Sequence, residues 1–336
     1  MGFLFSDKKK KQAHTENELS VFDRSLDELT PDDIAPAKPR DKRLTAYSFI
    51  RISLIIICLS IFAYCTYIFV NNMLEYKRAD EIYLSLSDEF FDVERNDDAT
   101  VNDGVTKMRQ VSPSVAIPIF AEAMKLEDSE LNRFYSEGSS DYNMEFERMK
   151  SKLEDLRKQN NDIVGFIYAA GTKISYPVTR YTDNEYYLDH SFDKKTLKSG
   201  TIFMDYRNVK AIGENRNIVI YGHNMSNGSM LGGVTKFYKS QDFFNKTPII
   251  LYAFDGIYTF EVFSVYRTTS DYQYFRTAFD TEKDFLDFAY QVKGNSVYQK
   301  DIEFEDGDIL MTLSTCTNTT QMGRYALHAK LTKIDK

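Results

Sequence analysis

The stretch Leu310–Leu331, LMTLSTCTNTTQMGRYALHAKL, decides the fold. Two apolar runs of strand-forming residues flank a polar turn, which predicts two paired antiparallel strands. Cys316 ends the first run and Arg324 opens the second, a separation of eight residues (324 − 316). A loop between two paired strands can return the arginine to the side of the cysteine. We therefore expect this thiol and this guanidinium to be neighbours.

Short strand-like runs separated by turn residues also precede this pair. They are DIVGFIYAAGTKISYPV, GTIFMDYRN, RNIVIYGHN and TPIILYAFDGIYTFEVFSVYRTT. The Asp255-Gly256 turn and the alternation that follows it predict a hairpin. Residues 281–292, TEKDFLDFAYQV, predict a helix inserted between strands. An amphipathic helix is expected ahead of the first strand, from apolar residues at spacings of three and four: Phe146, Met149, Leu153 and Leu156.

These elements predict one mostly-β domain over residues 142–336, large enough to build its own core. Many short antiparallel strands with few helices favour a barrel over a parallel sheet. The overall net charge is −8, and the basic residues form no sustained stripe, so the sequence does not indicate a nucleic-acid partner.

Residues 52–70, ISLIIICLSIFAYCTYIFV, contain no charged side chain. At helical rise they span about 28 Å, close to the hydrocarbon thickness of a bilayer. We therefore expect an uncleaved transmembrane signal anchor over residues 46–72. Basic residues are denser before it than after it: Lys38, Arg40, Lys42, Arg43 and Arg51 against Lys77 and Arg78. The positive-inside rule then puts the N-terminus in the cytoplasm and the later residues outside.

Two flanking regions carry no chemistry that the sequence can assign. Residues 1–45 are polar and mixed in charge, which predicts a disordered cytoplasmic tail. Residues 73–141 predict an extracytoplasmic stalk or linker between the membrane and the β domain.

Cys316 is the only one of three cysteines outside the membrane segment, so it has no partner there for an intramolecular disulfide. A buried, inert thiol is one interpretation and a nucleophile is the other. A nucleophilic cysteine needs an imidazole for proton transfer and a group that stabilises an oxyanion. His223 ends a strongly apolar strand and precedes a polar turn, whereas His190 and His328 are typical of packing or surface histidines. Arg324 can hold an oxyanion through two hydrogen bonds.

Several motifs together resemble the class B sortases over residues 142–336. They are TLSTC followed eight residues later by arginine, NIVIYGHNM, SGTIFMDYRN, NNDIVGFIYAAGTKISYPV and DNEYYLDHSFDKK, in the family's order. The single-span topology also fits. Phe166 departs from the pattern, because family members usually have tryptophan near the start of the first strand. The resemblance implies an eight-stranded sortase β-barrel with a helix inserted between the sixth and seventh strands.

The resemblance also implies an activity. Sortases of the Gram-positive cell envelope cut a C-terminal sorting signal after threonine and join it to a peptidoglycan amine. Cys316 would be the nucleophile, His223 the general acid and base, and Arg324 the stabiliser of the oxyanion. The substrates would be secreted proteins with Asn-Pro-x-Thr-Asn-like or Pro-x-Thr-Gly-like signals. The enzyme would sit in the cell membrane with its catalytic domain outside.

Signal recognition is expected from the region around the inserted helix, with Tyr272, Tyr274 and Phe275 as candidates, and from Ser314 and Thr315 beside the nucleophile. No cofactor or metal is implied: class B enzymes are not expected to need calcium, and no EF-hand spacing is present. A zinc site is disfavoured because no close-spaced ligand pair exists.

Other functions remain open on the sequence. The chain could polymerise pilin subunits onto a lysine acceptor, or be a cysteine endopeptidase without transfer activity. Papain-like enzymes place the cysteine before its histidine, whereas here His223 precedes Cys316 by 93 residues (316 − 223). A membrane-anchored binding protein with an inert cysteine is the alternative from another class.

Overall fold

The computed structural model of the chain describes residues 46–92, 140–317 and 322–335. Eight strands close into a barrel in the order β1-β2-β3-β4-β7-β8-β6-β5, which confirms the predicted architecture. The strands are β1 (Ile163–Tyr168), β2 (Ser175–Thr179), β3 (Ile202–Met204), β4 (Asn217–Tyr221), β5 (Ile249–Ala253), β6 (Gly256–Thr269), β7 (Leu310–Cys316) and β8 (Gly323–Asp335).

The sequence had suggested a wholly antiparallel sheet, but two of the strand pairs are parallel. β2 pairs with β3 in parallel, and β4 pairs with β7 in parallel. The other six neighbouring pairs are antiparallel, including the β5–β6 hairpin at Asp255-Gly256 and the β7–β8 pair. The β4–β7 pairing matters most for function, because both strands then end at the same edge of the barrel.

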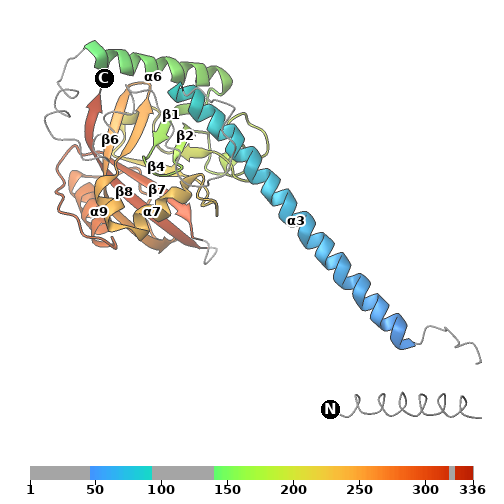
Figure 1. Cartoon of the computed structure of the whole chain (residues 1–336). Coiled ribbons are helices and arrows are strands. Elements are labelled where there is room, and N and C mark those ends of the chain that lie inside the picture. The colour runs from blue at the N-terminus through green and yellow to red at the C-terminus, as the bar shows by residue number, and fades with distance from the viewer. Residues whose placement is uncertain (1–45, 93–139, 318–321, 336) are drawn as a thin grey trace, which may run out of the picture. The chain divides into compact units, whose positions relative to one another are not determined.

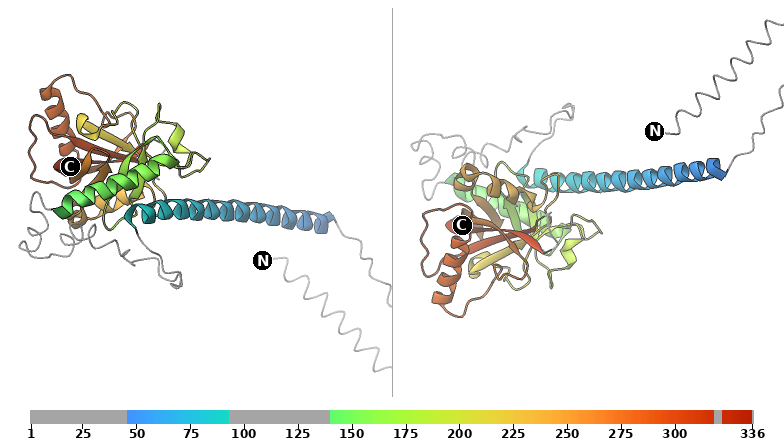
Figure 2. Two further views of the ribbon diagram at one scale, coloured as in Figure 1. Left: turned by 90° about the horizontal axis from the view of Figure 1, so that it is seen from above. Right: turned by 90° about the horizontal axis from the view of Figure 1, so that it is seen from below.

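Helices cover the outside of the barrel. Figures 1 and 2 place α6 (Ser140–Gln159) on one side and α9 (Glu282–Gly294) on another. α9 is the predicted inserted helix between β6 and β7. The Thr281 side chain caps it by accepting a hydrogen bond from the Asp284 amide, and its apolar side is buried through Phe285, Phe288, Ala289 and Val292. Two short helices, α7 (Val234–Lys239) and α8 (Gln241–Lys246), lie between β4 and β5.

The helix α3, Ala46–Phe91, contains the predicted membrane anchor. Over Phe49–Phe91 it meets the length and hydropathy that a membrane-crossing helix requires. The chain divides into two units, Met1–Tyr67 and Ile68–Lys336, and α3 runs across that boundary.

The second part of α3 lies within the predicted stalk, residues 73–141, and packs on the barrel. Tyr83 and Phe90 are 3% and 0% exposed and belong to the barrel core. Phe90 stacks on Phe166 with ring centroids 4.2 Å apart, and the Tyr83 hydroxyl donates to the Gly200 carbonyl at 2.5 Å. Apolar residues at helical spacing form one side of this part of α3, between many charged residues, and this side packs on the barrel. The rest of the predicted stalk, residues 93–139, and the predicted tail, residues 1–45, lie outside the described residues.

Candidate active site

Cys316 is the last residue of β7, and its side chain is partly exposed. Cys316 and Arg324 are direct partners in the antiparallel β7–β8 register. Beyond them, the Thr317 amide donates to the Gly323 carbonyl at 2.8 Å, which continues the ladder past the cysteine. The predicted neighbourhood of Cys316 and Arg324 is therefore present, and it comes from strand pairing alone.

His223 follows β4 by two residues and reaches the same edge of the barrel. In the parallel β4–β7 register Tyr221 lies opposite Ser314. The Asn224 side-chain amide donates to the Cys316 carbonyl at 2.9 Å. The side chain of the residue after His223 is thus hydrogen-bonded to the backbone carbonyl of the cysteine.

The His223 ring has a defined partner. Its Nε2 lies 2.7 Å from the Leu188 carbonyl oxygen, in the 3-10 helix η2 (Tyr186–Leu188) between β2 and β3. A carbonyl oxygen only accepts, so Nε2 carries the proton in this contact. Nδ1 is then the ring nitrogen left to exchange a proton with a reacting group.

Arg324 is the second residue of β8, lies opposite Cys316 in the strand register and is partly buried. Its Nη1 donates to the Gly323 carbonyl at 2.9 Å. The Tyr274 hydroxyl lies within electrostatic reach of this guanidinium and of the Cys316 thiol. Burial raises the pKa of Tyr274. Its hydrogen bond with Ser314 and the positive charge of Arg324 oppose that rise, and Cys316 adds to it. Three of the predicted site residues therefore share one electrostatic environment.

The residues predicted to bind substrate have different hydrogen-bond partners in the structure. Ser314 and Tyr274 are brought together, with their hydroxyl oxygens 2.7 Å apart and both residues buried. Thr315 is also buried and donates to the Gly222 carbonyl at 2.7 Å, so its hydroxyl ties β7 to the turn that carries the histidine. The Tyr272 hydroxyl instead accepts a hydrogen bond from Asn295, at the end of α9.

The other two histidines of the β domain face different surroundings. His328 lies inside the barrel wall with no exposed surface, between Tyr266 and Thr312. The His190 ring stacks on Tyr186 at 4.1 Å, and its Nδ1 lies 2.8 Å from the Tyr186 carbonyl oxygen. Within the described ranges, no three His, Cys, Asp or Glu side chains cluster as metal ligands would.

The barrel domain is similar to known proteins. A model of the sortase domain matches residues 167–332. Sortase B of Listeria monocytogenes is 38% identical over 187 residues, which cover 54% of this chain and 75% of that protein. Sortase B of Staphylococcus aureus is 37% identical over 196 residues, 56% of this chain and 78% of that protein.

The chain belongs to the sortase B family. It is accordingly a cysteine transpeptidase of the sortase type, as the motifs had suggested. Solved structures agree with this sortase's fold. The Staphylococcus aureus sortase B–substrate complex is 34% identical with a TM-score of 0.52, covering 57% of this chain and 91% of that one. Clostridium perfringens sortase B is 32% identical with a TM-score of 0.51, covering 54% and 100%.

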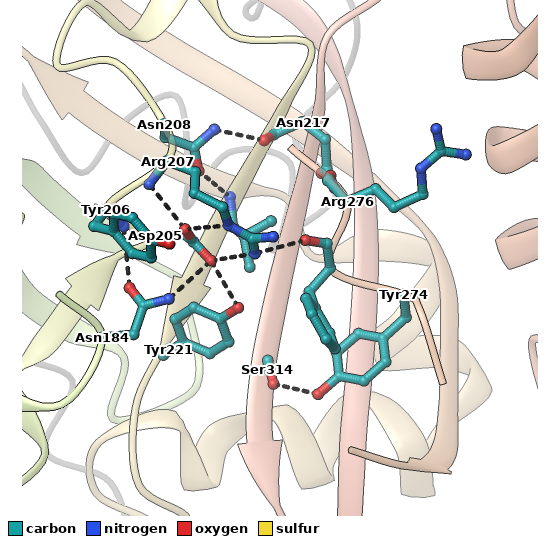
Figure 3. Close-up of polar contacts among 12 residues, drawn as sticks. Asn184, Asp205, Tyr206, Arg207, Asn208, Asn217, Tyr221, Tyr274, Arg276 and Ser314 are labelled. Atoms are coloured by element: carbon teal, nitrogen blue, oxygen red, sulfur yellow. Dashed lines mark hydrogen bonds and ion pairs between the residues drawn. The ribbon is translucent and has the colours of Figure 1, made fainter. Parts of the chain in front are cut away.

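The structure adds to this sortase a polar cluster that the sequence did not reveal. Asp205, just after β3, has no exposed side-chain surface and is paired with Arg207 at 2.6 Å. The Tyr221 hydroxyl and the Asn184 amide also donate to its carboxylate, at 2.9 and 3.1 Å (Figure 3). Burial opposes its charge, but hydrogen bonds from Arg207 and Tyr221 hold the pKa of Asp205 below its usual range. The available signal was the motif MDYRN, which suggested family membership but no contact.

Proposed function

We propose that this sortase is anchored in the cell membrane and transfers secreted proteins onto a cell-wall amine. It would cut a C-terminal sorting signal after threonine through a thioacyl intermediate on Cys316. The observation that carries the proposal is the meeting of three strand ends. β7 delivers Cys316 opposite Arg324 of β8, and the residue after His223 is bonded to the Cys316 carbonyl.

In the first half-reaction, the Cys316 sulfur attacks the carbonyl carbon of the signal's threonine. A C–S bond forms and the scissile C–N bond breaks. The thiol proton passes to Nδ1 of His223 and from there to the departing amine. The partly exposed thiol at the end of a strand is open to such a substrate. The Nε2 contact with the Leu188 carbonyl fixes the ring and leaves Nδ1 for the proton transfer.

In the second half-reaction, an acceptor amine attacks the thioester. Its nitrogen loses a proton to His223 and a new amide forms. Cys316 leaves as the thiolate, which takes that proton back from His223. Arg324 stabilises the negative oxygen of both tetrahedral intermediates, since a charged donor beside the developing charge acts most strongly there. Splitting one difficult exchange into two steps is the advantage of a covalent intermediate.

The position of the signal is proposed from the neighbours of the thiol. Ser314 and Tyr274 lie together near Cys316, buried and bonded to each other, so we assign them to the packing directly beneath the bound signal. Thr315 and Tyr272 are bonded elsewhere and would support the site indirectly. The complex of Staphylococcus aureus sortase B with a substrate supports a peptide site in this family.

The membrane orientation is part of the proposal. The apolar helix within Phe49–Phe91 supports the anchor, and the excess of basic residues before it supports a cytoplasmic N-terminus. The catalytic domain would then face the cell wall, where signals and acceptor amines meet. A membrane-impermeant thiol reagent should label Cys316 on intact cells, and labelling only after lysis would contradict this orientation.

The reaction is tested with the full chain in detergent and Cys316→Ala as control. Peptides with Asn-Pro-x-Thr-Asn and Pro-x-Thr-Gly endings are incubated with no amine, with oligoglycine, with a diamino acid, or with a lysine-containing pilin-type peptide. Mass spectrometry should find cleavage after threonine and a product joined to an amine. Joining only to the lysine side chain would indicate a pilin polymerase, and cleavage without joining would indicate an endopeptidase. A wild-type protein as inactive as Cys316→Ala on every peptide would contradict the proposal.

A further inference from the structure

Three consecutive residues between β6 and β7, Tyr274–Arg276, are each tied to the barrel wall by a different bond (Figure 3). We name them the anchored segment. The Tyr274 hydroxyl is bonded to Ser314 of β7 at 2.7 Å. The Phe275 carbonyl accepts from Nη2 of Arg207 at 3.2 Å. The Arg276 carbonyl accepts from the Asn217 side-chain amide, in β4, at 2.7 Å.

The donor that holds Phe275 is itself fixed by a buried acid. The Asp205 carboxylate accepts hydrogen bonds from Nε and Nη2 of Arg207 at 2.8 and 2.6 Å. This two-point contact fixes the orientation of the guanidinium. The same guanidinium lies over the Phe275 ring, 5.6 Å from its centroid. Asp205 also accepts a hydrogen bond from the hydroxyl of Tyr221, the last residue of β4. The Asp205–Arg207 pair is therefore connected to the strand that leads to His223.

The second donor is as firmly held as the first. Asn217 has no exposed surface, and its Oδ1 accepts from the Thr312 hydroxyl of β7 at 2.9 Å. On the outer side, the Arg276 guanidinium pairs with Asp284 in the first turn of α9 at 2.8 and 2.5 Å. The anchored segment is therefore fixed between the barrel and the inserted helix.

The anchored segment lies beside the reacting groups. Tyr274 is bonded to Ser314, two residues before Cys316, and side chains two residues apart on a strand lie on the same face of the sheet. A loop that must be ordered when a peptide binds weakens binding by the cost of that ordering. A segment already held by three bonds avoids that cost.

We propose that Asp205, Arg207 and Asn217 are positioning residues that hold Tyr274–Arg276 in place as a preformed contact surface for the sorting-signal peptide. They act through the segment and touch no reacting atom. This inference rests on the proposed function, because it gives these residues a role in signal binding.

The test compares Arg207→Gln with a matched control, Arg157→Gln, in the full chain. Arg157 also pairs with a carboxylate, Glu154 at 3.2 Å, and also lies over a ring, Phe254 at 4.7 Å, but on α6. Hydrogen–deuterium exchange should become faster at residues 272–278 in Arg207→Gln alone. KM for the signal peptide should rise about tenfold, as expected for a lost charged hydrogen bond, with a much smaller change in kcat.

Arg207→Lys and Asn217→Ser sharpen the comparison. Lysine can reach Asp205 or the Phe275 carbonyl but cannot present a fork to both, so its KM should lie between those of the wild type and Arg207→Gln. Asn217→Ser removes the other donor and should raise both exchange and KM in the same direction.

Two outcomes overturn the inference: unchanged exchange at residues 272–278 in Arg207→Gln, or faster exchange with KM unchanged. A wild-type protein without turnover on any signal would count against the proposed function instead. In that case the exchange experiment still decides whether Arg207 anchors the segment.

Discussion

His223 and His328 lie on either side of the same strand, β7, yet the protein places them in opposite environments. His223 follows β4 at the edge of the barrel, partly exposed, with Nε2 on a backbone carbonyl. His328 lies in the middle of β8, fully buried, and opposite Thr312 in the strand register. One imidazole is open to a substrate, and the other is part of the wall.

The hydrogen bonds of His328 support a structural role for this residue. The Thr312 hydroxyl donates to Asn217, so it accepts from Nδ1 of His328. The Nε2 atom of His328 then accepts from the Tyr266 hydroxyl. A neutral ring satisfies both contacts. Desolvation lowers the pKa of His328 to about 3, so the ring stays neutral at physiological pH. Position along the strand, at its end or in its middle, therefore distinguishes the histidine that we propose as reactive from the one that we propose as structural.

The largest effect should come from His223→Ala. Without the imidazole, neither the leaving amine nor the acceptor amine exchanges a proton, and cleavage should slow by about 10² to 10⁴-fold. The melting temperature should change little, because the ring is partly exposed. Peptide cleavage and thermal unfolding measured on the same sample check both halves. A large loss of stability would make His223 structural like His328 and break the comparison.

Arg324→Lys should come next, with a loss of about 10²-fold in kcat. The charge stays beside Cys316, but an ammonium cannot present a planar fork to an oxyanion. The matched control is Arg267→Lys on the neighbouring strand β6, whose guanidinium lies over the Tyr325 ring. It should keep near wild-type rates. Equal rates for the two variants would mean that Arg324 is only structural.

His328→Ala should reverse the pattern of His223→Ala. It leaves a cavity and removes a partner from two buried hydroxyls, so the free energy of unfolding should fall by about 2 to 4 kcal/mol. The folded fraction should retain its kcat within about threefold. Denaturant unfolding and steady-state rates below the new melting temperature are the measurements. Loss of turnover in a fully folded sample would place His328 in the reaction.

The smallest effect is a pH dependence of stability. The folded pKa of His328, about 3, lies below the ordinary value of 6.5, so between these values the unfolded chain binds the extra proton. The contribution of His328 is complete above pH 6.5 and is lost as the pH falls, by about 1.4 kcal/mol per pH unit. The free energy of unfolding of His328→Gln should lack that slope between pH 5 and 7. The difference between the wild type and this variant should therefore grow as the pH rises. An identical slope would show that His328 takes up no additional proton on unfolding.

The sequence predicted the parts of this sortase that depend on short separations. Cys316 and Arg324 face each other because eight residues suffice for a turn between paired strands, and the barrel confirms that register. The inserted helix was predicted from its own apolar periodicity. Strand existence and helix existence are local properties, so a pattern of residues can report them.

The contacts that the sequence did not reveal join distant segments. Nothing in local spacing states that β4 pairs in parallel with β7, which brings His223 to Cys316. Acidic side chains are usually exposed, but the carboxylate of Asp205 is buried. Its burial is explained by its ion pair with Arg207, which local sequence does not predict. Tyr83, in the predicted stalk, packs on the barrel, and this contact too joins segments far apart in the sequence.

The central claim is that Cys316 forms a thioacyl bond with the sorting signal. The most direct measurement is the intact mass of the full chain, quenched with acid seconds after mixing with a cleavable signal peptide and no amine, followed by peptide mapping. We expect an adduct equal to the signal up to its threonine, on Cys316 and not on Cys58 or Cys65, which disappears when an amine is added. Cleavage with no adduct on Cys316, or cleavage that persists in Cys316→Ala, would contradict the account.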